Sequence, residues 1–175
     1  MYKLINKFPK SILLLLYFSL IYPYLIYCVT IWGNSPVSHI RYLIINQNSI
    51  LRIIFNVKKH DHITHYYIVL KLLSIRQLYL LYLSLLTYKL WILKYHIDFY
   101  NFFQSNINNS LISLRHKKLF YISKSRTNLY NNSTFVTAMR LWNFIPDECR
   151  STTSIPLFKG KIKSLIWEGF FTHFN

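Results

Sequence analysis

The sequence is poor in acidic residues and glycine, and each shortage excludes a class of function. It has five Asp and Glu residues in 175, and only Asp147 and Glu148 are adjacent. A catalytic acid–base pair would need a substrate cleft that shifts the pKa values of both groups. We therefore expect these two acids to lie at the start of a helix, where negative charge is stabilised. With three glycines, the sequence has no Gly-rich phosphate-binding loop.

Cysteine is also scarce, and the three histidines that are close in sequence have few other potential metal ligands near them. Cys28 and Cys149 are too few and too far apart for a disulfide framework, which favours free thiols in a reducing, intracellular compartment. His60, His62 and His65 form a His-x-His-x-x-His pattern beside Asp61, which binds zinc only if a turn gathers the rings. No cysteine or further carboxylate is nearby, so we predict a polar, partly solvated loop and no metal site.

Apolar, aromatic and basic residues are abundant. Hydrophobic residues make up 53% of the chain and aromatic residues 18%, a composition unlike that of disordered proteins. A net charge of +16 predicts a polyanionic partner, either a nucleic acid or an anionic membrane surface. A compositional bias toward Ile, Tyr, Asn, Lys and Leu would give the same charge, so charge alone does not choose the partner.

The longest apolar stretch, residues 17–35, sits in a segment (11–40) without any charged side chain. Residues 12–32 are long enough to span a bilayer and follow three lysines. However, tyrosines and Pro23 fall in the middle of this run, whereas membrane tyrosines prefer the two interfaces. We therefore favour a second explanation, in which the run belongs to the core of a larger protein.

Periodicity predicts a mostly α fold, an irregular bundle of about five to six helices with a long polar loop. Residues 1–16 form a lead-in, 17–97 a helical region, 98–132 a basic Asn/Ser-rich loop and 133–175 a C-terminal helical segment. Pro23 is expected to kink or break the first helix, and Ser38 to cap the next. The remaining helices are predicted over residues 40–55, 66–73, 75–95 and 133–144, with a last one opened by Pro156.

The basic loop contains the densest cluster of positive charge, with aromatic residues between the cations. Basic groups for phosphates and aromatic rings for base stacking are typical of nucleic-acid-binding segments, although a solvated loop would explain the same lysines. The candidate binding residues are Arg115, Lys117, Lys118, Lys124 and Arg126.

Three stretches share their order and spacing with a known family. The first is Tyr17-x-Ser19-x-Ile21-x-Pro23-x-x-x-Tyr27 running into Ile31-Trp32-Gly33-Asn34, and the second is Leu43-x-x-x-Gln47-Asn48-x-x-Leu51-Arg52-Ile53-Ile54. The third is Leu141-Trp142-Asn143-x-Ile145-Pro146-x-x-x-Arg150, followed by Ser154-x-x-x-Phe158-Lys159-x-x-Ile162-Lys163. Together they resemble the region after the polymerase palm in jockey-like reverse transcriptases of non-LTR retrotransposons, over nearly the whole chain from Tyr17.

The resemblance implies a thumb-like helical part of an RNA-directed DNA polymerase, which helps to hold template and product. In that family an Asp-Asp pair and another Asp hold two divalent metal ions for nucleotidyl transfer. This sequence has no Asp-Asp pair, so the two metal ions and the catalysis are expected only of a missing palm domain. The implied partners are RNA or an RNA–DNA hybrid, held through phosphates, and the missing polymerase domains.

Two hypotheses therefore stand. The first is a C-terminal reverse transcriptase fragment with at most nonspecific nucleic-acid binding and no catalysis by itself. The second is a small basic membrane protein anchored by residues 12–32. A reading frame without a selected function is a third alternative.

Overall fold

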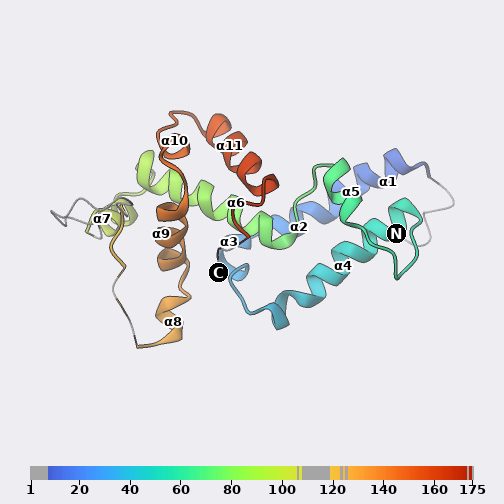
Figure 1. The fold of residues 1–175 in the computed structure, drawn as a ribbon, viewed down its shortest axis with the longest axis horizontal. Helices are drawn as coiled ribbons and strands as arrows, with labels where there is room; N and C mark the ends of the chain where they lie inside the picture. The colour runs from blue at the N-terminus through green and yellow to red at the C-terminus, as the bar shows by residue number, and fades with distance from the viewer. Residues whose placement is uncertain are drawn as a thin grey trace. The chain divides into compact units, whose positions relative to one another are not determined.

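The structure is a computed structural model that describes residues 8–105, 107, 119–122, 124, 126–172 and 174. Within these residues the chain is helical, with one isolated antiparallel bridge between Ile107 and Phe120 and no strand (Figure 1). Six of the α-helices have seven or more residues. The predicted helical class is thereby confirmed.

The chain divides into two compact units, Met1–Tyr79 (unit 1) and Leu80–Asn175 (unit 2). The division falls within helix α6 (Ile75–Thr87). Unit 1 contains α1 (Lys10–Leu16), η2 (Tyr17–Ile21), α2 (Tyr22–Ile26), α3 (Val29–Trp32), α4 (Val37–Phe55) and α5 (Thr64–Val69). Unit 2 contains η3 (Tyr88–Ile92), α7 (Ile97–Ser105), α8 (Asn128–Asn131), α9 (Thr134–Phe144), α10 (Asp147–Arg150) and α11 (Ile155–Trp167).

The first helical stretch of unit 1 continues through Pro23 and ends four residues later, at Tyr27. The turn before the proline is π-helical, and the Tyr22 N–H donates to the carbonyl of Tyr17, five residues back. Such a widened turn accommodates a residue that has no N–H donor. Tyr27 is extended and Cys28 is left-handed, with φ 50°, so the helix ends there. A kink or break was expected at Pro23; the helix instead continues through the proline after a π-helical turn, and its break lies at Tyr27 and Cys28.

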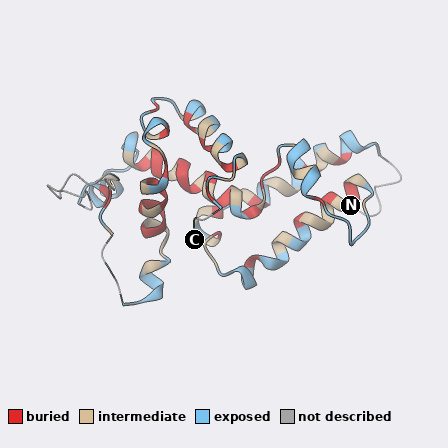
Figure 2. Cartoon of the chain, in the orientation of Figure 1, coloured by how far each residue is buried: buried red, intermediate tan, exposed pale blue. Residues whose placement is uncertain are grey.

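Helix α4 packs against the first stretch through its apolar stripe. Its N-cap is Pro36 and not Ser38, which lies within the helix. The core of unit 1 is a cluster of buried residues from α1, η2, α4 and the segments around α5 (Figure 2). Its members are Leu13, Tyr17, Leu51, Ile54, Ile63 and Leu72.

In unit 2 the predicted polar loop begins too early, because residues 97–105 form helix α7. Its aromatic rings give the reason. Phe99 stacks on Phe135 at 5.0 Å between ring centroids, and Phe103 is fully buried against Trp91 and Phe120. Packing of apolar side chains therefore overrides the Asn-rich composition that favoured a loop.

Candidate nucleic-acid-binding site

The first two sequence motifs meet in the interior of unit 1. Gln47 is a polar residue within the apolar stripe of α4, and its exposed fraction is 1%. Its Nε2 donates one hydrogen bond to the Tyr17 hydroxyl and another to the Leu73 carbonyl oxygen, both at 3.1 Å. An amide nitrogen has two hydrogens, so this geometry uses both. Burial raises the pKa of Tyr17, and the hydrogen bond from Gln47 opposes this in part.

The rest of the first motif shapes the chain after the helix break. The Trp32 indole Nε1 donates to the Tyr27 carbonyl at 2.7 Å, while the Tyr27 ring is exposed. Gly33 is pressed against Tyr79, and a Cβ at this position would lie 2.5 Å from that ring. Only glycine fits so close an approach. Pro23 is exposed in the first turn of α2.

Arg52 of the second motif connects α4 to the histidine-containing loop. Its Nη2 donates to the Asp61 carbonyl oxygen at 3.4 Å. One turn earlier, Asn48 accepts a 2.9 Å hydrogen bond from the Tyr67 hydroxyl. Burial raises the pKa of Tyr67, with a smaller contribution from Tyr17, and nearby Arg52 opposes the shift. These α4 polar groups therefore hold the loop and α5 in place.

The third motif forms the interior of unit 2. Trp142 is 1% exposed, and its ring lies 5.8 Å from that of Phe158 on α11. Phe158 in turn stacks on Tyr88, whose hydroxyl donates to the Thr152 carbonyl at 2.8 Å. Pro146 ends α9 and is the N-cap residue of α10, as its fixed φ and missing N–H favour. The motif residues thus join η3, α9 and α11.

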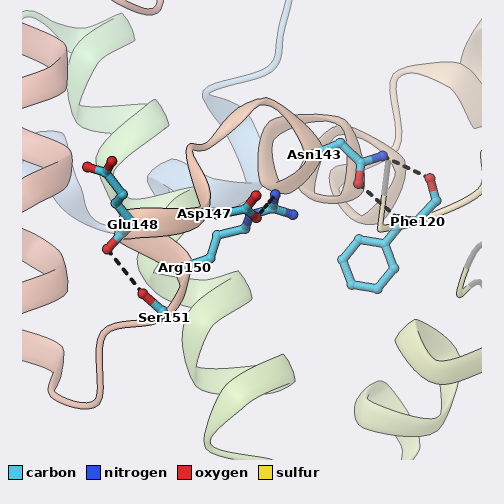
Figure 3. Close-up of polar contacts among 6 residues, drawn as sticks. All are labelled: Phe120, Asn143, Asp147, Glu148, Arg150 and Ser151. Atoms are coloured by element: carbon cyan, nitrogen blue, oxygen red, sulfur yellow. Dashed lines mark hydrogen bonds and ion pairs between the residues drawn. The ribbon is translucent and has the colours of Figure 1, made fainter. Parts of the chain in front are cut away.

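Asn143 anchors the segment that enters the candidate binding loop. Its amide makes two hydrogen bonds with the backbone of Phe120, accepting from the N–H at 2.9 Å and donating to the carbonyl at 2.8 Å (Figure 3). Phe120 also forms an isolated antiparallel bridge with Ile107. The Asn143 side-chain amide therefore pairs with the Phe120 backbone as a neighbouring strand would, and holds Phe120 against α9.

The structure places only part of the predicted binding set. Lys124 and Arg126 are exposed, and Tyr121 between the anchor and these cations is 61% exposed. An exposed ring within a few residues of exposed cations in the sequence has the composition that stacks bases and contacts phosphates. Arg115, Lys117 and Lys118 lie outside the described residues.

The structure also describes the adjacent acids and the histidines that the sequence singled out. Asp147 is in the first turn of α10 and pairs with Arg150, and the Glu148 carbonyl accepts from Ser151 (Figure 3). His60, His62 and His65 are exposed. In the part of the chain that the structure describes, no three His, Cys, Asp or Glu side chains are grouped to hold a metal ion.

Sequence reasoning missed one surface feature of unit 1, an open apolar hollow of about 430 Å³ where α2, α3 and α4 meet. It was missed because it depends on the turn at Tyr27 and Cys28. Its lining residues are Tyr24, Leu25, Tyr27, Cys28, Trp32, Ser35, His39, Ile40 and Leu43. The mainly apolar and aromatic sequence of residues 17–35 was the available signal.

Among the described residues, no helix combines the length and the apolar composition needed to cross a bilayer. Comparison of the chain with protein-family models, curated proteins and solved structures finds no match.

Proposed function

We propose that this chain is the helical, thumb-like region that follows the palm in a jockey-like non-LTR retrotransposon reverse transcriptase. In this role it binds the phosphates of RNA or of an RNA–DNA hybrid without sequence preference and catalyses nothing by itself. The two metal ions of nucleotidyl transfer belong to the palm, because this sequence has no Asp-Asp pair to hold them.

The observation that carries the proposal is that the motif residues are paired with one another across long sequence distances. Tyr17 and Gln47 come from different motifs, 30 residues apart, and share a buried hydrogen bond. Trp142 and Phe158 come from the two halves of the third motif and share the core of unit 2. Motif positions that depend on each other in this way support a domain selected as a unit over a coincidence of common residue types.

The exposed apolar surface of the first helices supports the proposal that this chain packs against other domains of a polymerase. Leu13, Tyr17 and Leu25 face inward, yet the opposite side is also apolar. Leu20 is 59% exposed and Tyr24 is 81% exposed. A helix that is apolar on all sides normally has neighbours all round it. The missing polymerase domains would supply them.

Binding of the recombinant chain to a fluorescein-labelled RNA–DNA hybrid, followed by anisotropy over a range of NaCl concentrations, tests the proposal. We expect a Kd of about 10⁻⁶ to 10⁻⁴ M at physiological salt, with log K falling linearly against log salt concentration because condensed counterions are released. Replacing Lys124 and Arg126 together with glutamine should make that slope less negative by about two, since each removes about one phosphate contact.

A matched pair in unit 1, Lys58→Gln with Lys59→Gln, serves as the control for net charge. Primer extension with nucleotides and Mg²⁺ should give no product. Extension of the primer, or binding that does not depend on salt, would contradict the proposal. Association with vesicles that resists carbonate, in place of hybrid binding, would favour the membrane hypothesis.

A further inference from the structure

The hollow where α2, α3 and α4 meet is walled largely by aromatic side chains. Among its nine lining residues, Tyr24, Tyr27 and Trp32 are aromatic, and none is Lys, Arg, Asp or Glu. The Trp32 indole Nε1 donates to the Tyr27 carbonyl at 2.7 Å, which holds the turn that carries both residues. The Tyr24 and Tyr27 side chains are 81% and 75% exposed. Their rings are therefore open to a molecule that enters the hollow.

The size and the polar groups of the hollow suit a planar, uncharged ring system. Its volume of about 430 Å³ lies in the range of about 300–1,000 Å³ that small-molecule sites occupy. Ser35 and His39 are also in the lining, and they carry a hydroxyl and an imidazole, which can hydrogen-bond the edges of nucleobases. Aromatic rings stack on any base, because every base has a π-face. An unpaired base therefore matches both the walls and the polar groups.

The charge of unit 1 favours a nucleic acid as the source of that ring system. Residues 1–79 contain nine Lys and Arg residues and a single acidic residue, Asp61. This excess attracts a polyanion, whereas the lining of the hollow has no cation to hold a phosphate. A nucleic acid combines the two properties, since its backbone is anionic and its bases are uncharged.

We propose that this aromatic hollow binds an unpaired base of the bound nucleic acid, stacked against its tyrosine rings. The inference rests on the proposed function and specifies the form of nucleic acid that unit 1 selects, a hybrid flanked by unpaired nucleotides. Tyr24 also belongs to the exposed surface that other polymerase domains would cover. The hollow thus lies at the edge of a domain interface, where ligand sites are frequent.

Replacing Tyr24 and Tyr27 together with leucine removes both exposed rings, while the Trp32 hydrogen bond, which uses the Tyr27 backbone, stays. Affinity for an RNA–DNA hybrid with an unpaired template extension should fall by about fivefold or more, as the loss of one stacked base predicts. Affinity for a blunt hybrid and the dependence of log K on log salt should not change, because neither ring contacts a phosphate. Replacing both with phenylalanine keeps the rings and should preserve binding. Tyr42→Leu, at a residue 75% exposed on α4 and outside the lining, is the matched control.

A 2-aminopurine base in the unpaired extension reports stacking directly, because its emission falls when it stacks on an aromatic ring. The emission should fall when the wild type or the phenylalanine double variant binds, and should stay unchanged with the leucine double variant. Wild-type affinity and quenching in the leucine double variant would overturn this site and leave the hollow to a side chain of another polymerase domain. An equal loss in Tyr42→Leu would also overturn it. A wild-type chain that fails to bind even the blunt hybrid would instead contradict the proposed function itself.

Discussion

Replacing Gln47 with alanine is expected to destabilise unit 1 by about 3 kcal/mol. The change removes two hydrogen bonds and leaves the Tyr17 hydroxyl and the Leu73 carbonyl without this donor. Each buried polar group left unsatisfied costs about 1–3 kcal/mol and the lost side-chain volume adds a cavity term, whereas loss of the buried Gln47 Oε1, which has no partner among the described residues, offsets part of the cost. Urea unfolding followed by circular dichroism at 222 nm measures the loss.

A double-mutant cycle with Tyr17→Phe tests whether the loss comes from this contact. Removing the hydroxyl should cost less in the Gln47→Ala background than in the wild type, with a coupling of about 1 kcal/mol. Asn46→Ala, the exposed neighbour on α4, is the control and should be neutral or slightly stabilising. Strictly additive losses for Tyr17 and Gln47 would rule out the motif pairing described for unit 1.

Trp142→Ala is expected to have the largest effect in unit 2, a loss of about 3–5 kcal/mol. The indole is 1% exposed and packs on Phe158, so truncation leaves a large cavity between α9 and α11. Since native domains are stable by only about 5–15 kcal/mol, this loss would remove a large share of the stability of unit 2 and should lower its Tm clearly. A thermal melt followed by circular dichroism gives the comparison.

Trp142→Phe provides a sharper variant at the same site. The indole Nε1 is buried and has no hydrogen-bond partner among the described residues, so phenylalanine loses volume but also removes an unpaired polar group. The phenylalanine variant should therefore lose less than half of what the alanine variant loses. Leu129→Ala, at a residue that is 87% exposed in unit 2, should change stability by no more than about 0.5 kcal/mol. A large effect at Leu129, or none at Trp142, would contradict the packing of α9 on α11.

Helix positions were accessible from the sequence where apolar periodicity was strong. The stripe predicted over residues 40–55 corresponds to α4, and Pro156 lies in the first turn of the last helix as expected. Helix α7 was missed because its packing rings, Phe99 and Phe103, stand among residues typical of loops. The break at Tyr27 and Cys28 was not predicted, because a π-helical turn lets the helix continue through Pro23. Such a widened turn has no characteristic residue composition.

The candidate site was less accessible, because its contacts join residues far apart in sequence. A glutamine within an apolar stripe suggests a buried polar group, yet its partners at Tyr17 and Leu73 lie 30 and 26 residues away. The amide of Asn143 reaches Phe120, 23 residues earlier. Periodicity describes one helix at a time and says nothing about such pairs. The basic residues could be named from charge, whereas the contact between Asn143 and Phe120 could not be predicted.

The central claim, that this chain belongs to a retroelement polymerase, is tested most directly by the genomic DNA upstream of the codon for Met1, translated in all frames. The account predicts a palm-like segment ending in an aromatic-Ala-Asp-Asp box, in frame or one frameshift away. It would supply the carboxylates for two metal ions and the neighbours for the exposed apolar helices. A promoter preceded by unrelated sequence would contradict the account and would return attention to the hypothesis of a membrane protein.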